Sequence, residues 1–256
     1  MVNPERFHRL IEDARSADFS GWDFSWLDGR MTQADPPWDY QALVNTHIQQ
    51  ARSMLDMGTG GGEFLASLPK LPPDTHATES FPPNQPIAEQ RLTPLGVTTH
   101  NTDEDAPLPF DDHHFDLVIN KHESYDPAEV QRVLKPGGHF ITQQVGGLDN
   151  LELNQVLEPS QRFPITKWGL TLALTKLYET NFTVLRAEKA ALTTAFADIG
   201  SVVYYLKAIP WQVEGFNPDT HQNGLVSIHN IIEKQGHFLT TAHRFLILAR
   251  IGRGVL

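Results

Sequence analysis

Residues 54 to 62, Met54-Leu55-Asp56-Met57-Gly58-Thr59-Gly60-Gly61-Gly62, organise the fold of this chain. They close a short apolar segment, present an acid and then glycines at alternate positions, and lead into residues 63–68, whose apolar side chains have helical spacing. This order predicts a strand, a tight turn and a helix, the unit that brings a nucleotide-like ligand against bare backbone. We therefore expect a cofactor site at this turn.

The spacing of the glycines separates two classes of cofactor. A dinucleotide site requires Gly-x-Gly-x-x-Gly, because the pyrophosphate binds at a free helix N-terminus. Counting from Gly58, the third glycine would fall at Glu63. Asp56 and Glu63 then place two carboxylates where phosphate oxygens would lie, which suits a ligand carrying an ammonium and a sulfonium group. The alternative is a tight turn in any parallel α/β domain, with Glu63 merely favourable to the helix dipole.

Two later stretches carry further motifs. Residues 102–120 contain acids, then Leu-Pro-Phe, then Phe-Asp-Leu-Val, and residues 134–138 read Leu-Lys-Pro-Gly-Gly, which ends a helix and reverses the chain. With Asp-x-Gly-x-Gly-x-Gly at residues 56–62, they resemble the class I S-adenosylmethionine (SAM) dependent methyltransferases, by motif over residues 51–145. The resemblance implies methyl transfer by direct displacement, in which the enzyme orients the reactants and excludes water.

The resemblance also implies cofactor contacts. Asp56 and the glycines would hold the methionine portion of SAM, and the predicted residues of this turn are Asp56, Gly58, Thr59, Gly60 and Gly62. Glu79 lies 21 residues beyond Gly58 (79 − 58), at the end of the second strand, where an acid can bind a ribose diol. Chance alone would often place a surface carboxylate there. For the adenine amino group Asp103 is the first choice and Glu104 the second, and Asn120 completes the cofactor-binding set.

The loop after the fourth strand contains the predicted catalytic residues, His122 and Glu123. Ligands of an open parallel sheet bind at the carboxyl ends of its strands, which puts this loop beside the reactive methyl group. A His next to an acid can remove a proton from an oxygen or nitrogen acceptor. The alternative is a polar loop that only packs against the cofactor, since methyl transfer often needs only positioning. Asp126 as N-cap and Glu129 at the third helical position are interpreted as structural.

The adjacent histidines His113 and His114 look like a metal-binding pair. They lie at a turn tip beside Asp111 and Asp112, with no further ligands at a defined spacing. We interpret them as solvated turn residues and predict no metal site.

Aromatic residues outside the motifs are candidates for the acceptor pocket. Three of the five tryptophans lie within residues 22–38, in a stretch rich in glycine and proline, and Trp22 and Trp26 would line the pocket if this segment is a lid. Otherwise they anchor an N-terminal arm to the core. Tyr204, Tyr205 and Trp211, in an insertion of over fifty residues after residue 186, are further candidates, although an apolar helix more often serves packing.

The order of elements predicts an α/β fold. We expect a Rossmann-like, seven-stranded, mostly parallel sheet with an antiparallel last strand, helices on both faces, an N-terminal arm and a helical insertion between strands six and seven. The predicted organisation is one methyltransferase domain, residues 1–256, divided into an arm or lid (1–37), a SAM-binding core (38–190), a helical insertion or cap (191–240) and the last strand (241–256).

Composition limits the partners. With 20 basic and 31 acidic residues the formal charge is −11, which disfavours a nucleic-acid substrate and favours a small-molecule acceptor. There are no cysteines, no stretch of transmembrane length and no signal-peptide core after Met1, so we expect a soluble, cytoplasmic protein without a disulfide scaffold. Two alternatives stay open: an RNA base methyltransferase, and a SAM-binding sensor without catalysis.

Overall fold

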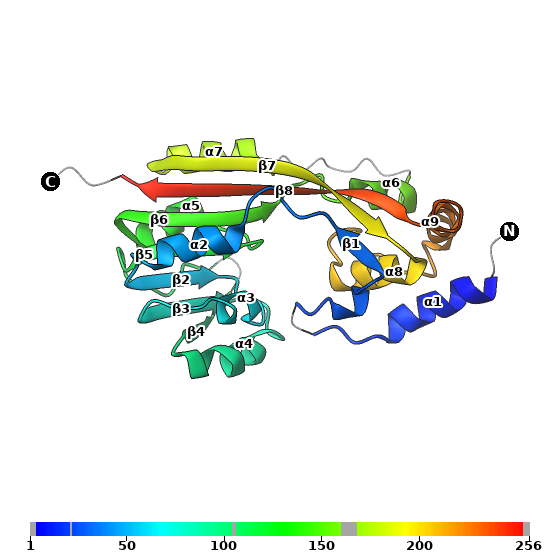
Figure 1. Cartoon of the computed structure of the whole chain (residues 1–256), viewed down its shortest axis with the longest axis horizontal. Helices are drawn as coiled ribbons and strands as arrows, with labels where there is room; N and C mark the ends of the chain where they lie inside the picture. Colours follow the sequence, from blue (N-terminus) through cyan, green and yellow to red (C-terminus); the bar gives the residue numbers. More distant parts are fainter. Residues whose placement is uncertain (1–3, 21, 104–105, 160–167, 253–256) are drawn as a thin grey trace. The chain divides into compact units, whose positions relative to one another are not determined.

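The computed structural model describes residues 4–20, 22–103, 106–159 and 168–252. The chain forms two compact units, drawn in Figure 1. The sheet unit comprises Pro37–Gly146, Lys167–Ala190 and Arg244–Leu256, and the helical unit comprises Met1–Pro36, Gly147–Thr166 and Ala191–His243. Boundaries between the two units fall after Pro36 and after Ala190. The assignment of residues 147–166 to the helical unit was not predicted.

The sheet has the predicted mostly parallel topology, with strand order β1-β7-β8-β6-β5-β2-β3-β4. Its parallel strands are β2 (Ser53–Met57), β3 (Asp74–Glu79), β4 (Thr98–Asn101), β5 (Phe115–Lys121) and β6 (Leu134–Val145). The last strand, β8 (Phe238–Ile251), pairs antiparallel with β6, from His139 opposite Arg250 to Val145 opposite Arg244. The Rossmann-like fold is thus confirmed.

Helices cover both faces of the sheet unit, as predicted. Its helices are α2 (Tyr40–Ile48), α3 (Glu63–Ala66), α4 (Gln85–Leu92), the 3-10 turn η2 (Thr93–Leu95), α5 (Pro127–Val133) and α7 (Leu170–Glu179). Alternate residues of β5 serve opposite faces: Leu117 and Ile119 pack in one core with α2 and α4, and Val118 packs in the other with α5 and α7. Asp126 caps α5 by accepting from the backbone N–H of Ala128, which confirms its structural role.

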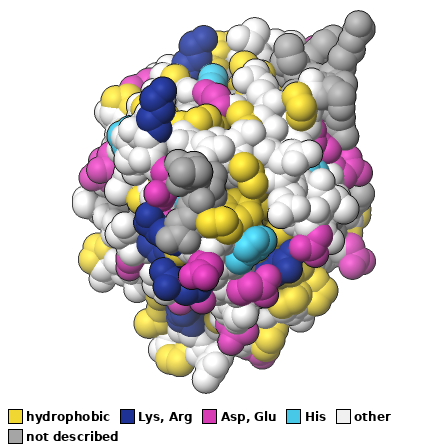
Figure 2. Space-filling model, turned by 90° about the vertical axis from the view of Figure 1, so that its right-hand side faces the viewer, with side chains coloured by type: hydrophobic (Ala, Val, Ile, Leu, Met, Phe, Trp, Pro, Cys, Tyr) yellow, Lys and Arg dark blue, Asp and Glu magenta, His cyan; other side chains and the backbone are white. Residues whose placement is uncertain are grey.

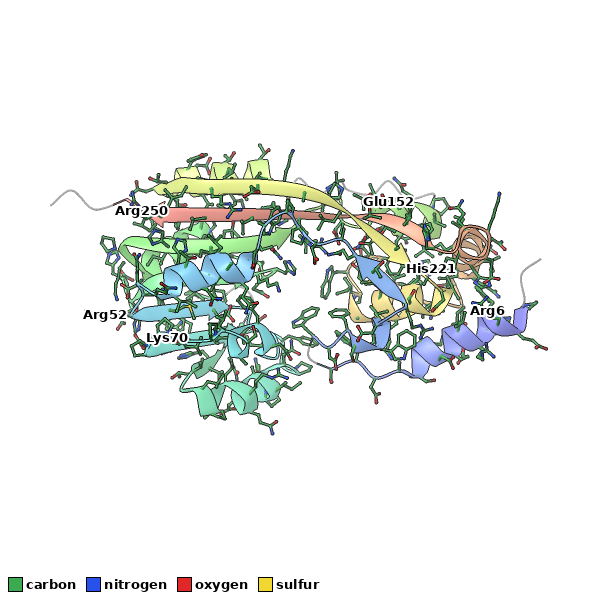
Figure 3. All side chains as sticks on the ribbon, viewed as in Figure 1. Arg6, Arg52, Lys70, Glu152, His221 and Arg250 are labelled. Carbon is green, nitrogen blue, oxygen red and sulfur yellow. The ribbon has the colours of Figure 1, made fainter. Side chains whose placement is uncertain are left out.

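The helical unit has its own hydrophobic core. It contains α1 (Pro4–Ser16), the 3-10 turn η1 (Ser25–Leu27), β1 (Met31–Gln33), α6 (Leu151–Leu157), α8 (Ile199–Ala208) and α9 (Gln222–Gln235). Arg6 on α1 donates to Glu233 on α9 at 2.7 Å, which joins two helices of the unit. Thr241 donates through both its backbone N–H and its hydroxyl to Glu152, which joins a strand residue to α6. Arg6 and Glu152 are labelled in Figure 3.

Two strands are longer than predicted, and one strand was not predicted. β7 (Phe182–Phe196) and β8 run past the predicted 182–186 and 245–250 and contribute to both units, so the insertion between them narrows to residues 197–237. Charged residues such as Glu188 and Lys189 concealed this extension, because they interrupt an apolar run without breaking the strand alternation. The eighth strand, β1, pairs antiparallel with the end of β7 and adds to the seven predicted.

The surface carries mixed charge. On the face shown in Figure 2, acidic, basic and hydrophobic side chains alternate, without a broad basic patch among the side chains drawn in colour. Within the described ranges, none of the helices combines the length and the apolar character that crossing a bilayer would require.

Candidate functional site

A cavity of about 490 Å³ lies in the sheet unit, where β2, β3, β4 and β5 end. This is the edge at which open α/β sheets bind ligands. The lining residues follow the four strands in turn: Met57, Gly58, Thr78, Ser80, Thr102, Asp103, Ala106, Pro107, Leu108, Glu123, Ser124, Tyr125, Asp126 and Glu129. The cavity therefore brings together three of the predicted site residues, Gly58, Asp103 and Glu123, from three different loops.

The glycine turn between β2 and α3 needs glycine for two reasons. Gly58, Gly60 and Gly62 all have positive φ values, of 67°, 62° and 81°, which other residues adopt only at a cost. At Gly58 an added Cβ would also lie 2.5 Å from the Cβ of Glu123. The absence of a side chain at Gly58 thus allows the loop after β5 to pack directly against the turn.

Asp56, the acid of the motif, is buried in β2, with 3% of its surface exposed. Its Oδ2 accepts a hydrogen bond from the hydroxyl of Thr59 at 2.8 Å, so Thr59 links the strand to the turn. Burial raises the pKa of Asp56 to about 7, against the lowering effects of Thr59 and of the Lys121 charge. Asp56 is therefore a buried acid that gains from a nearby cation, as the ammonium group of SAM would provide.

Glu79, at the end of β3, is fixed by the glycine turn itself. Its Oε2 accepts from the backbone N–H of Gly60 at 2.6 Å, and its Oε1 accepts from that of Phe81 at 2.8 Å. Burial raises the pKa of Glu79, and these backbone donors oppose that effect. In the sequence Glu79 lies between the cavity residues Thr78 and Ser80, but it is not itself one of the lining residues, and its contact with a ribose stays a prediction.

The other predicted cofactor residues differ in their surroundings. Asp103 lines the cavity and is exposed. Glu104 lies outside the described residues. Asn120 is fully buried at the end of β5, where its Oδ1 accepts from Gln144 at 2.6 Å and its Nδ2 has no partner in the described part of the chain. Asn120 therefore organises the strand ends behind the cavity, and its contact with a cofactor stays a prediction.

The predicted catalytic residues occupy one strained turn. His122 has a φ of 71°, and its Nε2 accepts from the side-chain amide of Gln143 at 3.0 Å. His122 as a whole residue is exposed to solvent. Desolvation of its ring is the main cause that lowers the pKa of His122, and the positive charges of Arg244 and Lys121 lower it further. A lowered pKa weakens a general base, and the catalytic role of His122 stays a prediction.

Tyr125 is a cavity residue that sequence reasoning missed. Its hydroxyl is buried without a hydrogen-bond partner among the described residues, and burial raises its pKa well above the usual range. The ring is held by edge contacts with Phe140 at 5.0 Å and Trp168 at 6.0 Å between centroids. A buried hydroxyl without a partner costs free energy unless a ligand or water satisfies it. Its place in the His-Glu-Ser-Tyr loop was the available signal.

Glu63 has a partner within the protein. It pairs with Arg91 of α4, which also donates to the carbonyl of Gly61. The sequence argument used Glu63 as a second carboxylate facing the ligand, whereas the structure directs its charge to an arginine. Asp56 is thus the more relevant acid of the pair.

The aromatic candidates all belong to the helical unit. Trp26 stacks on Tyr204, with 4.6 Å between the ring centroids, and Trp22 contacts Trp211 edge-on at 6.1 Å. Trp22 is 40% exposed and Trp211 is 67% exposed. Tyr204 donates its hydroxyl to the carbonyl of Asp18, and Tyr205 accepts from Asn150. Both tyrosines are buried in the core of the unit. The acceptor-pocket role of these five residues stays a prediction.

Comparison with known families agrees with this geometry. Residues 55–142, from β2 through β6, match the family described as methyltransferase domain. The sheet, the glycine turn and this match define the class of Rossmann-like methyltransferases. The matched part of the chain, residues 55–142, is thus a methyltransferase domain of the class I SAM-dependent type, for which SAM is the methyl donor.

Solved structures share the fold at low sequence identity. A candidate methyltransferase from Bacillus halodurans C-125 is 16% identical, with a TM-score of 0.61 and coverage of 84% of this chain and 99% of that one. A candidate sarcosine dimethylglycine methyltransferase from Galdieria sulphuraria is 19% identical, with a TM-score of 0.52, and the match covers 90% of this chain and 85% of that one. Geranyl diphosphate methyltransferase in complex with SAM is 13% identical, with a TM-score of 0.50, and the match covers 82% of this chain and 83% of that one. No curated protein sequence matches the chain.

Proposed function

We propose that this methyltransferase acts on an oxygen or nitrogen atom of a small-molecule acceptor. The acidic balance of the chain, −11, opposes binding to a phosphate backbone. Geranyl diphosphate methyltransferase, which shares the fold, is named for a small-molecule acceptor. Both observations support a small molecule over RNA.

The residues present fit SAM. The observation that carries this proposal is the contact of the glycine turn with two acids: Gly58 leaves room for Glu123 against bare backbone, and Gly60 donates to Glu79. In this proposal Asp56 holds the ammonium end, Glu79 the ribose hydroxyls and Asp103 the adenine amino group. Tyr125 lines the same cavity, and within the described ranges its hydroxyl has no hydrogen-bond partner, as expected of a group that binds a ligand.

Bound SAM supplies a methyl group on a positively charged sulfur. The protein's contribution is to hold the two reactants in line and to exclude water. Glu123, packed against Gly58, would hold the acceptor side of the cavity, and His122 would fix the conformation of that loop through Gln143. Because the pKa of His122 is lowered, we expect an acceptor that gives up its proton readily or carries none.

The test is a product assay with defined acceptor pools. The protein is incubated with SAM and either a small-molecule extract or total RNA, and S-adenosylhomocysteine is measured by mass spectrometry. We expect product only with the small-molecule pool. Glu79→Gln should lower kcat/KM for SAM by roughly tenfold or more, because charge-assisted hydrogen bonds are lost. Glu89→Gln, at an exposed glutamate of α4, is the matched control. Product formed with RNA instead would contradict the proposal.

A further inference from the structure

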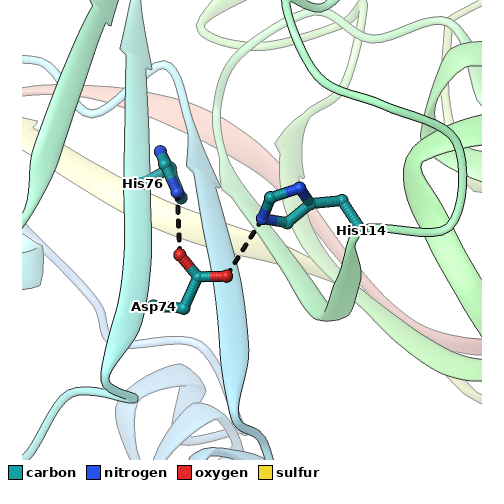
Figure 4. Close-up of side chains that lie close together, drawn as sticks. All are labelled: Asp74, His76 and His114. Carbon is teal, nitrogen blue, oxygen red and sulfur yellow. Dashed lines mark hydrogen bonds and ion pairs between the residues drawn. The ribbon is translucent and has the colours of Figure 1, made fainter.

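A second polar cluster lies at the opposite edge of the sheet unit, where the strands begin. Asp74 opens β3, His76 follows two residues later and so projects from the same face, and His114 directly precedes β5. β2 lies between β3 and β5 in the sheet. Figure 4 shows the Asp74 carboxylate between the two imidazole rings.

The three side chains offer the ligand atoms of a transition-metal site. The Nε2 of His76 is 3.0 Å from one carboxylate oxygen of Asp74, and the Nε2 of His114 is 3.0 Å from the other. All three donor atoms lie within 4.8 Å of one another. Tetrahedral zinc, with bonds of about 2.0–2.1 Å, requires donors about 3.3 Å apart. Each histidine lies close to a carboxylate oxygen, but the two contacts are with different oxygens of Asp74. A rotation of this carboxylate and a shorter distance between the two histidines would bring one oxygen and both nitrogens into that arrangement.

The surroundings of the cluster resemble an oriented ligand set. The other ring nitrogen of His76, Nδ1, lies 2.9 Å from Nε2 of His100 on β4, a contact of the kind that fixes the tautomer and orientation of a metal-bound histidine. Phe115 packs against both ligand rings, at 5.7 Å from His76 and 4.5 Å from His114. The contacts with His100 and Phe115 thus restrict the orientation of the His76 ring.

One side of the cluster is open to solvent. The exposed fractions of the Asp74, His114 and His76 side chains are 49%, 31% and 17%. A metal ion could therefore enter from solution, and water would complete its coordination. Asp74, the most exposed of the three, has the freedom to adjust as the histidines approach each other.

We propose that Asp74, His76 and His114 bind one divalent transition-metal ion, with Zn²⁺ as the best match to two imidazoles and a carboxylate. The site links the starts of β3 and β5 across β2. Glu79, at the far end of β3, is five residues along the strand from Asp74, or roughly 16 Å at the usual rise. The metal therefore stabilises the sheet and does not take part in methyl transfer.

This arrangement explains why the site could not be recognised from residue spacing. The adjacent histidines do not act together: His113 places its Nδ1 3.0 Å from the carbonyl oxygen of Leu134, while His114 meets an aspartate 40 residues earlier in the chain. Sheet pairing, rather than a short spacing, assembles the ligands. The sequence analysis considered His113 and His114 as a pair and so predicted no metal.

The experiment uses the untagged full chain, freed of metal by a chelator. Calorimetric titration with ZnCl₂ should give one site per chain, and Co²⁺ should give the visible absorption of a site with nitrogen ligands. His114→Gln and His76→Gln should each weaken zinc binding by at least 100-fold, and His100→Gln by roughly 10- to 100-fold. Zinc should raise the Tm of the wild-type chain and leave that of His114→Gln unchanged.

The control is His237→Gln, which removes an exposed histidine outside the cluster and should leave zinc binding unchanged. Asp74→Asn is a second ligand variant, with the same shape and no charge, in case a histidine variant fails to fold. A wild-type chain that binds no zinc stoichiometrically would overturn the proposal. The proposal would also be overturned if His237→Gln weakened zinc binding as much as the ligand variants do, or if all three ligand variants bound zinc like the wild-type chain. The cluster would then be only a hydrogen-bonded network.

Discussion

Asp56 shows how one residue connects folding and cofactor binding. It is buried with a single hydroxyl partner, Thr59, and its pKa is about 7 rather than 3.8. The folded chain holds this proton more tightly than the unfolded chain does. Protonated Asp56 therefore contributes fully to the free energy of unfolding below about pH 4, and this contribution, on the order of 4 kcal/mol in total, is lost as the pH rises toward 7. Such a cost at neutral pH is reasonable for a residue that serves a ligand.

Asp56→Asn should therefore stabilise the protein at high pH. The amide keeps the shape and can still accept from Thr59, but it carries no buried charge. Measured by urea unfolding without SAM, the variant should gain about 2–3 kcal/mol over the wild-type chain between pH 5 and pH 8. Asp111→Asn, at an exposed position, changes the net charge equally and is the control. An equal pH dependence in wild type and Asp56→Asn would refute the account of this buried acid.

The residues of the candidate site were predictable to different degrees. The glycine turn and Glu79 follow from local order along the chain, because a strand, a turn and a helix fix where they lie. For Tyr125 the only signal was its place in the loop after the fourth strand, because the lack of a hydrogen-bond partner among the described residues depends on packing that the sequence does not reveal. The pairing of Glu63 with Arg91 likewise depends on α4, which the turn motif does not encode.

Among the secondary-structure elements, α8 depends on one aspartate. Asp198 accepts from the backbone N–H of Ser201 as N-cap, and it forms two hydrogen bonds with Arg30, at 2.8 and 2.9 Å. Arg30 precedes β1 directly in the chain. Asp198 therefore fixes both the start of a buried helix and the segment that leads into the added strand.

Asp198→Ala should cost more than the loss of an ordinary helix cap. We expect a destabilisation of about 2–3 kcal/mol, because a cap is worth about 1 kcal/mol and Arg30 would lose its partly buried partner. Asp39→Ala is the matched comparison, since Asp39 caps α2 through Ala42 at an exposed position, and it should cost about 1 kcal/mol. Hydrogen exchange of the α8 amides measures the effect. Equal losses in the two variants would show that Arg30 contributes nothing.

The elements that were predicted well are those with a strong local pattern. The strands of the parallel core and the capped helix at Asp126 follow from periodicity and capping residues. β1 and the long ends of β7 and β8 could not be predicted. Their pairing is decided by contacts between Met31–Gln33 and Thr194–Phe196, far apart in sequence, in a stretch with too few apolar residues to indicate a strand.

At the scale of the whole molecule, the chain comprises a sheet unit, which carries the cavity at the strand ends, and a helical unit with a separate core. Fold class and cofactor class follow from the sheet unit alone, where the family match also lies. The matched residues 55–142 lie in the sheet unit, and the acceptor role of the aromatic residues of the helical unit stays a prediction. The predicted division into one domain with an arm and a cap stays a prediction.

The measurement that tests the central claim most directly is calorimetric titration of SAM into the wild-type chain, Gly58→Ala and Gly96→Ala. Both glycines have positive φ, 67° and 77°, so both variants bear the same backbone strain, but only at Gly58 would the new Cβ meet Glu123. We expect micromolar binding, about −8 kcal/mol, for the wild-type chain and Gly96→Ala, and at least tenfold weaker binding for Gly58→Ala. Equal SAM affinity in the two variants, or binding of NAD in place of SAM, would contradict the site described here.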